Sequence, residues 1–290
     1  MFWLILAQLA CAGAPTLHSQ TAELKRTEAS PLPVRAIWPE GDGPFPVIVF
    51  SHGVYGNRDG YKPLVEHWAR NGYLVVMPSH GDKGKVTDVA ALIKRPQELK
   101  LVLDRVPTLV EKAGLGGKVD LEHIGVAGHS YGAHSAMMVG GMVMTNPKTG
   151  KAIRTADDRV DSLLVISPGG TEASVRPDAW DNLVSPSLMV IGSEDVSNRN
   201  GKDAAWRRQA WSHVKDGWLL WIKGADHDYG GIADKGDGDR TQVKILQDTT
   251  LQFWDATLKG HSEAEAWLDD NKIGEHYGGK ASVERRRAGG

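Results

Sequence analysis

The sequence contains very little cysteine: Cys11 is the only one in 290 residues. A lone thiol cannot close a disulfide within the chain, so the fold is expected to form without that constraint. Cys11 follows a short apolar run, and removal of the first 12 residues would leave no thiol at all. With that cleavage, cysteine catalysis is excluded together with a disulfide framework.

Long apolar runs are also absent. The run Phe2–Ala10 is too short to cross a bilayer as a helix, so no membrane span is expected. Ala10 and Ala12 form an Ala-x-Ala-like cleavage site, which predicts a signal peptide over residues 1–12 and a secreted or periplasmic protein. The run lacks the Lys or Arg that usually precedes it. A lipoprotein signal ending at Cys11 is the alternative, but Gln8 stands where that signal needs an aliphatic residue.

Charge blocks and several well-known motifs are missing as well. The formal net charge is −2, with no run of like charge through the body of the chain, so nucleic acid is not an expected partner. There is no His-Glu-x-x-His, Walker loop or dinucleotide fingerprint. Asp234, Asp237 and Asp239 cluster in a glycine-rich loop, but their spacing lacks the full calcium-loop pattern. A solvated turn is favoured over a metal site.

What the chain does contain is an alternation of short apolar runs and helical patterns, which is typical of an α/β sheet. The predicted strands are 34–38, 46–51, 73–77, a run ending before Ser130, 161–167, 188–191 and 218–222. The predicted helices are 61–71, 97–113, 133–144, 204–213, 241–258 and 263–269, and Pro107 is expected to kink or shorten the second of them.

This order predicts one domain over residues 31–272, with a mostly parallel central sheet and helices on both faces. Residues 145–159 are expected to form a surface excursion, and no insertion between the strands at 161–167 and 188–191 is long enough for a large lid. Residues 13–30 are expected to be a loosely held lead-in, and residues 273–290 a flexible tail.

The stretch Gly128-His129-Ser130-Tyr131-Gly132 carries the strongest functional signal. A strand, a Gly-x-Ser-x-Gly turn and a helix in that order form the context of a nucleophile elbow. The two glycines have no Cβ, so strand and helix can approach closely on either side of Ser130. The backbone N–H of Tyr131, just past the nucleophile, is then expected to face the oxyanion that forms on attack.

A serine nucleophile needs a base, and the base needs an orienting carboxylate. In this architecture the order along the chain is Ser, then Asp or Glu, then His, with the last two in loops after later strands. Asp195 follows the predicted strand 188–191 and is the expected acid, with Glu194 and Asp228 as rivals. His227 follows the strand 218–222 and is the expected base.

The second oxyanion donor is expected from the loop after the strand at 46–51. There His52-Gly53-Val54 provides a flexible glycine followed by the N–H of Val54. The favoured interpretation of His52 is a loop histidine that hydrogen-bonds backbone groups and holds the turn, rather than a group that takes part in the chemistry.

Tryptophan is abundant, with ten in the chain, and four of them lie close together at Trp206, Trp211, Trp218 and Trp221. Core packing is the favoured interpretation of this stretch. A platform for a carbohydrate or an aromatic ligand is the alternative.

Taken together, these residues resemble those of an α/β-hydrolase, and more narrowly of the group that contains plasma-type platelet-activating-factor acetylhydrolases, dienelactone-hydrolase-like proteins and chlorophyllases. The residues that carry the resemblance are 49–53, 56–58, Tyr61, 67–69, 72–73, 78–82 and 128–132. The resemblance implies Ser130 as nucleophile, Asp195 and His227 as its partners, Val54 and Tyr131 as backbone oxyanion donors, and ester hydrolysis without a cofactor or metal.

Two departures limit what the resemblance implies. Dienelactone hydrolases use a cysteine nucleophile where this chain has Ser130, so lactone hydrolysis of that kind is not implied. Cutinase-like polyester hydrolases usually hold a C-terminal disulfide, which this chain cannot form. The sequence therefore predicts a serine carboxylic-ester hydrolase that acts on small or short-acyl esters through an acyl-enzyme. The alternatives are polyester, thioester or amide substrates, or a non-catalytic secreted binding protein on the same scaffold.

Overall fold

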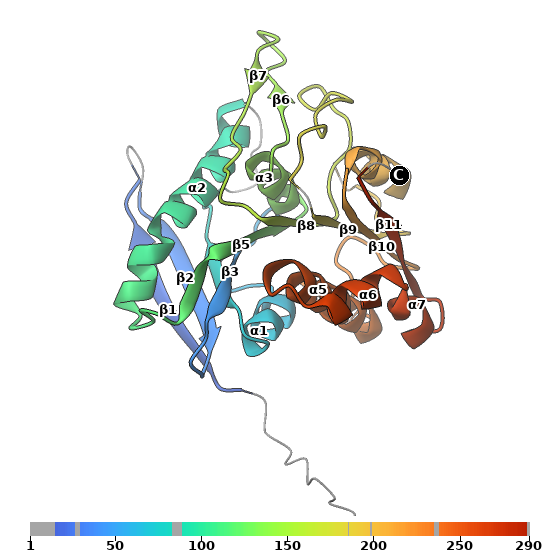
Figure 1. The fold of residues 1–290 in the computed structure, drawn as a ribbon. Helices are drawn as coiled ribbons and strands as arrows, with labels where there is room; N and C mark the ends of the chain where they lie inside the picture. The colour runs from blue at the N-terminus through green and yellow to red at the C-terminus, as the bar shows by residue number, and fades with distance from the viewer. Residues whose placement is uncertain are drawn as a thin grey trace, which may run out of the picture.

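The computed structural model describes residues 15–26, 30–82, 89–184, 186–197, 199–234 and 238–288 (Figure 1). The predicted signal peptide and Cys11 lie outside these residues. The strands are β1 (Leu17–Leu24), β2 (Leu32–Pro39), β3 (Phe45–Ser51), β4 (Leu74–Pro78), β5 (Val119–His129), β6 (Met144–Thr145), β7 (Ala152–Ile153), β8 (Ser162–Ile166), β9 (Ser187–Gly192), β10 (Gly217–Ile222) and β11 (Ala281–Arg286). The helices are α1 (Lys62–Arg70), α2 (Val89–Lys112), α3 (Tyr131–Val139), α4 (Ala204–Arg207), the 3-10 helix Arg208–His213, α5 (Arg240–Leu258), α6 (Ser262–Asp269) and α7 (Lys272–His276).

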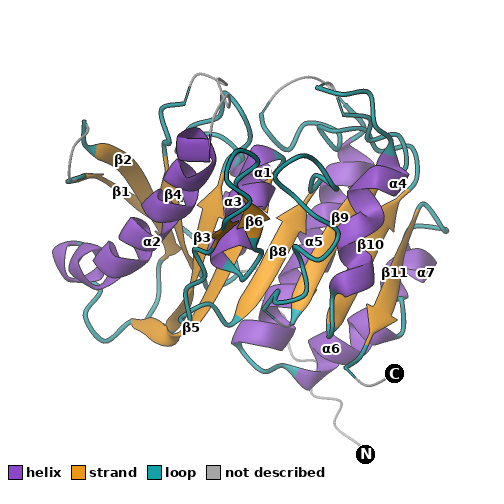
Figure 2. Ribbon diagram, turned by 90° about the horizontal axis from the view of Figure 1, so that it is seen from above, coloured by secondary structure: helices purple, strands orange, loops and turns teal. Residues whose placement is uncertain are grey.

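Nine strands form the central sheet, in the order β1-β2-β4-β3-β5-β8-β9-β10-β11 (Figure 2). The six strands from β4 to β10 pair in parallel, and antiparallel pairs occur only toward the two edges, at β1–β2, β2–β4 and β10–β11. Helices cover both faces: α2 and α3 lie on one side of the sheet, and α1, α5 and α6 on the other (Figure 1). The predicted α/β fold with a mostly parallel sheet is confirmed.

The alternation of side chains along each strand divides the core into two layers. In β3, Val47 and Val49 pack toward α2 and α3, whereas Ile48 and Phe50 pack toward α1 and α5. All seven residues of β3 are buried, as are all those of β4, β8 and β9. Strands covered on both faces need continuous apolar sequence, which is why the apolar runs identify them.

Two segments outside the expected domain are ordered strands, so the predictions of a loose lead-in and a flexible tail are wrong there. Residues 17–24 form β1, which pairs along its whole length with β2. Residues 281–286 form β11 beside β10, and α7 precedes it. Both are antiparallel edge strands without an apolar run, and β1 buries only Leu24 of its eight residues. In β11 the buried Ala281 and Val283 alternate with the exposed Ser282 and Glu284.

The basic end of β11 is held by aromatic surfaces rather than released into solvent. The guanidinium carbon of Arg285 lies 4.1 Å from the ring centroid of Trp218, and that of Arg286 lies 5.3 Å from the ring centroid of Trp211. Arg285 also pairs with Asp216. Cation–π contacts with tryptophans and an ion pair with a carboxylate therefore stabilise the basic end of this strand.

Two helix predictions also differ from the structure. Helix α2 begins at Val89, earlier than predicted, and continues through both Pro96 and Pro107. Buried residues before and after Pro107, Val106 and Leu109 among them, anchor the helix on both sides. Helix α3 ends at Val139 rather than at 144, because Gly140 is followed by Gly141 with φ 110°. Met144 instead starts the small β6–β7 hairpin within the predicted surface excursion.

The described part of the connection between β8 and β9 contains little regular secondary structure. Residues 167–184 contain turns and one isolated bridge between Glu172 and Val175, with no helix among them. The expectation that no large lid lies at this position stays a prediction.

The turn between β5 and α3 depends on a close backbone approach at Gly132. A Cβ on Gly132 would lie 1.9 Å from the carbonyl oxygen of Ser51 and 2.7 Å from that of His52. Because these are backbone atoms, we expect Gly132→Ala to lower the free energy of unfolding by about 3 kcal/mol or more. Urea unfolding measures the loss, with Gly116→Ala as the matched control because a Cβ there has no heavy atom within 4 Å. Equal stability of the two variants would contradict the tight elbow.

Candidate active site

Ser130 occupies the turn between the end of β5 and the start of α3. Its backbone has φ 56° and ψ −118°, a conformation that a residue with a side chain rarely adopts. The Ser130 N–H donates to the carbonyl of Ile166 at 2.9 Å, which ties the turn to the end of β8. Strain of this kind persists where the surrounding structure enforces it and is characteristic of a nucleophile elbow.

The three residues expected to form a triad are brought together at the carboxyl ends of their strands. His227 Nε2 lies 2.9 Å from Ser130 Oγ, and His227 Nδ1 lies 2.8 Å from Asp195 Oδ1. A carboxylate can only accept, so Nδ1 carries the proton and Nε2 is left to accept from the serine hydroxyl. Ser167 Oγ lies 2.8 Å from the same Nδ1 and is a second polar neighbour of that atom.

The rivals for the acid do not occupy this position. Glu194 is exposed beside the buried Asp195. Asp228 donates its backbone N–H to the side chain of Asp226, within the turn that carries His227. Asp195 therefore provides the carboxylate that lies within hydrogen-bond distance of the His227 imidazole.

Asp195 is fully buried and held by more than the imidazole. Arg207 Nε lies 2.9 Å from Asp195 Oδ1, and the Tyr229 hydroxyl donates to Asp195 Oδ2 at 3.2 Å. Burial opposes ionisation, but the hydrogen bond with His227 and the charge of Arg207 outweigh it, so the pKa of Asp195 lies below its usual value. The carboxylate is therefore ionised at neutral pH, as an orienting group for a histidine must be.

Arg207 is a functional-site residue that sequence reasoning missed. Its side chain is 5% exposed, and it also donates to the carbonyl oxygens of Asp195, Ser167 and Pro168. The guanidinium thus joins the loops after β8 and β9 beneath the imidazole. Position 207 falls in the tryptophan-rich helical stretch, where nothing in the sequence distinguishes it from a surface arginine.

We expect Arg207→Met to lower the free energy of unfolding at pH 7 by about 3 kcal/mol, because it leaves Asp195 buried without its cation. In the native protein the lowered pKa of Asp195 means that its carboxylate stabilises the fold above the ordinary carboxyl range, a contribution lost on acidification. Removing Arg207 raises that pKa, so the deficit should shrink as the pH falls toward about 4 and the carboxyl takes up a proton.

Urea unfolding at both pH values tests this prediction. The control is Arg176→Met, whose exposed pair with Asp178 is expected to contribute less than about 1 kcal/mol. A deficit in Arg207→Met that is the same at pH 7 and pH 4 would show that lost packing, not charge, is responsible.

A second chain of hydrogen bonds connects the base to the loop after β3. His129 Nε2 donates to the carbonyl of His227 at 2.9 Å, and His129 Nδ1 accepts from the Tyr61 hydroxyl at 2.8 Å. The Tyr61 oxygen in turn accepts the N–H of Gly53 at 3.0 Å. Burial lowers the pKa of His129 to about 3, so the ring is neutral and its tautomer follows from these partners. His129 occupies the first of the two variable positions in the Gly-x-Ser-x-Gly stretch, so the motif does not specify it.

The expected oxyanion residues lie on either side of the serine. Tyr131 is the first residue of α3, directly after Ser130, and Val54 is half-buried in the loop that follows β3. The role of their N–H groups stays a prediction. The backbone hydrogen bonds expected of His52 are present: its Nδ1 donates to the Gly53 carbonyl at 2.7 Å and its Nε2 accepts the His80 N–H at 3.2 Å.

The other candidate ligand sites have structural explanations. Asp239 caps α5 by accepting the Thr241 N–H, and Asp234 accepts the N–H of Lys62, while Asp237 lies outside the described residues. Trp206, Trp211 and Trp218 are buried, which agrees with core packing.

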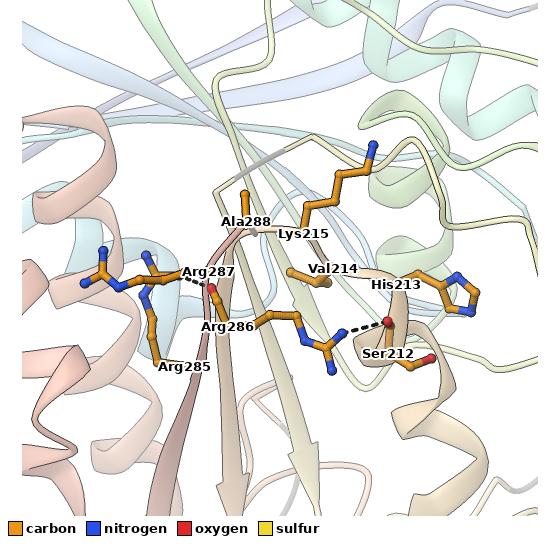
Figure 3. Close-up of a pocket in the computed structure, with 8 residues that line it drawn as sticks. All are labelled: Ser212, His213, Val214, Lys215, Arg285, Arg286, Arg287 and Ala288. Carbon is orange, nitrogen blue, oxygen red and sulfur yellow. Dashed lines mark hydrogen bonds between the residues drawn. The ribbon is translucent and has the colours of Figure 1, made fainter. Parts of the chain in front are cut away.

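A pocket of about 660 Å³ lies away from the triad, between the end of the 3-10 helix and the end of β11 (Figure 3). Its lining residues are Ser212, His213, Val214, Lys215, Arg285, Arg286, Arg287 and Ala288. Carboxylates neutralise much of this positive charge, since Arg285 pairs with Asp216 and Arg287 with Asp269. The triad lies at the opposite, carboxyl end of β10.

A mostly parallel sheet, covered by helices on both faces and carrying a strained serine between β5 and α3, defines a class of protein. The chain belongs to the α/β-hydrolase superfamily. Within it, the sequence model of the chlorophyllase family matches residues 11–150, a stretch that contains the loop after β3 and Ser130 but neither Asp195 nor His227.

Individual relatives agree with this assignment. The chain is 33% identical to the type 0 chlorophyllase of Chenopodium album over 127 residues, which cover 39% of this chain and 34% of that protein. It is 32% identical to chlorophyllase-1 of Arabidopsis thaliana over 118 residues, or 38% and 33% of the two chains. A phospholipase of Bacillus subtilis is 28% identical over 172 residues, or 56% and 58%. The matches span about a third of the length of the two chlorophyllases.

Proposed function

We propose that the protein is a serine hydrolase that cleaves carboxylic esters through an acyl-enzyme. The observation that carries this proposal is the continuous hydrogen-bonded series from Ser130 Oγ through the His227 ring to the buried Asp195 carboxylate. Similarity to chlorophyllases and to a phospholipase, over parts of those proteins, supports an ester as the substrate. A small-molecule ester is the substrate class that we favour.

In the first half of the reaction, His227 Nε2 takes the proton of Ser130 as the serine oxygen attacks the ester carbonyl. The imidazolium that forms is stabilised by the ionised Asp195, which also keeps the ring in the required tautomer. The Val54 and Tyr131 N–H groups would stabilise the tetrahedral oxyanion, and loss of one such donor costs about 3 kcal/mol of transition-state stabilisation. Collapse of the intermediate passes the proton from His227 to the leaving alcohol.

In the second half, His227 accepts a proton from water, which attacks the acyl group on Ser130. The same two N–H groups serve the second oxyanion, and the acid is released as the proton returns to the serine oxygen. These steps need the side chains and backbone groups named here and a water molecule. Among the described residues, no group of three or more His, Cys, Asp and Glu side chains is arranged to hold a metal ion.

The connection between β8 and β9 supports preference for small or short-acyl esters, because its described residues contain no helix that could form a large lid. Similarity to enzymes named for chlorophyll and for phospholipids favours a second candidate, a bulkier ester with a long hydrocarbon alcohol or acyl part.

Among the described residues, none of the helices has the length and apolar character needed to span a bilayer.

A panel of esters tests the proposal and separates the two candidates. Purified protein is assayed on p-nitrophenyl esters of two to sixteen carbons, on chlorophyll and on phospholipid vesicles. We expect hydrolysis, with kcat/KM highest for acyl chains of about two to six carbons. Preference for the longest chains or for chlorophyll would replace the short-acyl assignment. Folded protein that hydrolyses no ester in the panel would contradict the proposed activity and favour a binding protein on this scaffold.

A further inference from the structure

Arg95 is a buried cation whose partners lie next to the proposed oxyanion hole. It belongs to α2, its side chain has no exposed surface, and it forms a two-pronged pair with Asp82 through Nε and Nη2. It also donates from Nη1 to the carbonyl of His52 and from Nη2 to the carbonyl of Gly53, the latter at 3.3 Å. These two hydrogen bonds to backbone carbonyls are made in addition to the ion pair with Asp82.

The carbonyl of Gly53 belongs to the same peptide unit as the N–H of Val54. A peptide unit is planar and trans, so its N–H points away from its C=O. The Gly53 oxygen accepts from Arg95 Nη2, from His52 Nδ1 at 2.7 Å and from the Gly56 N–H at 3.2 Å. Donors to the carbonyl at one edge of this peptide unit therefore fix the direction of the Val54 N–H at its opposite edge.

The preceding peptide unit is fixed at both of its ends. The carbonyl of His52 accepts from Arg95, and the N–H of Gly53 donates to the Tyr61 hydroxyl. Two consecutive peptide planes of the loop after β3 are thus held by side chains from α2 and from the start of α1. A flexible glycine at position 53 would otherwise let either plane rotate.

The same guanidinium reaches the other proposed donor. The Arg95 Cζ atom lies 4.4 Å from the ring centroid of Tyr131, the residue after the nucleophile. Arg95 therefore contacts both loop backbone and elbow side chain, while Gly132 brings α3 against the carbonyls of Ser51 and His52. One buried side chain spans the two segments that would hold an oxyanion between them.

We propose that Arg95 is a positioning residue for the oxyanion hole: it locks the Gly53–Val54 peptide plane and its spacing from the elbow. The charged donor also polarises this peptide, which makes its N–H a stronger donor. This inference rests on the proposed ester hydrolysis. It assigns to a residue of α2 an effect on the transition state, exerted through the backbone of the loop after β3.

The test uses Arg95→Met and Arg95→Lys, with Arg176→Met as an exposed control. Active sites are counted with a fluorophosphonate, so that misfolded molecules do not enter the rates. For Arg95→Met we expect kcat/KM per titrated site to fall by about 100-fold, mainly through kcat, with KM changed by less than about threefold. Affinity for a trifluoromethyl ketone, whose adduct with serine carries an oxyanion, should fall by a similar factor.

Arg95→Lys keeps the charge beside Asp82 but cannot supply the planar fork, so we expect an intermediate loss of about 10-fold in both measurements. This variant also covers the case in which Arg95→Met does not fold. If either folded variant keeps kcat/KM and ketone affinity within twofold of the wild type, Arg95 has only a structural role. If the wild-type protein hydrolyses no ester and does not bind the ketone, the proposed function fails, whatever the Arg95 variants do.

Discussion

Replacing Ser130 by alanine is expected to lower kcat for ester hydrolysis by at least about 10⁴-fold, because no acyl-enzyme can then form. The residual rate would come from binding and from the oxyanion donors alone. KM should change little, since the serine hydroxyl contributes to the transition state more than to substrate binding. Steady-state kinetics on a short-chain p-nitrophenyl ester give both constants.

The matched control is Ser162→Ala. Ser162 is fully buried in the sheet, whereas Ser130 is half-buried. It begins β8 at the end opposite the triad, where its hydroxyl lies 3.2 Å from that of Thr257. We expect kcat of this variant to stay within about twofold of the wild type, since nothing in the triad depends on it. Retention of activity in Ser130→Ala would refute the mechanism, whereas equal losses in both variants would point to a folding defect.

The second large effect is expected for Asp195→Asn. The amide is nearly the same size as the carboxylate but lacks its charge, so it cannot hold the imidazole in the required tautomer or stabilise the imidazolium. We expect kcat to fall by about 10⁴-fold with little change in the fold. The Arg207 side chain and the Tyr229 hydroxyl both contact Asp195, so the variant protein should also be compared with the wild type by circular dichroism.

Glu194→Gln makes the same chemical change at the adjacent residue. Because Glu194 is exposed and Asp195 contacts the imidazole, we expect this control to keep kcat within about twofold. A large loss of activity in Glu194→Gln, with activity preserved in Asp195→Asn, would show that the acid is Glu194 and not Asp195.

The parts of the fold that were predictable are those buried on both faces. β3, β8 and β9 have continuous apolar sequences because helices cover both sides of them, and their limits were predicted to within two residues. The edge strands were not recognised, because β1 buries only Leu24 and β11 only Ala281 and Val283. Both gain order from pairing with β2 and β10. β11 pairs with β10, a segment far from it in sequence, and such pairing leaves little local signal.

The site shows the same distinction. Ser130, Asp195 and His227 could be predicted because each follows a recognisable strand in a fixed order, and the structure brings their side chains together. Arg95 and Arg207 could not be predicted in this way. Both lie on helices and reach the site through long side chains. Their partners are carbonyls and a carboxylate that come near them only in the folded chain.

The most direct test of an activated serine is mass spectrometry of the pure protein after reaction with a fluorophosphonate probe, with digestion to locate the label. We expect one label per chain, on Ser130, and its loss in His227→Ala, because the hydroxyl is a weak nucleophile without its base. A folded protein that takes up no label, or takes it up at another residue, would contradict the assignment of Ser130, His227 and Asp195 as a catalytic triad.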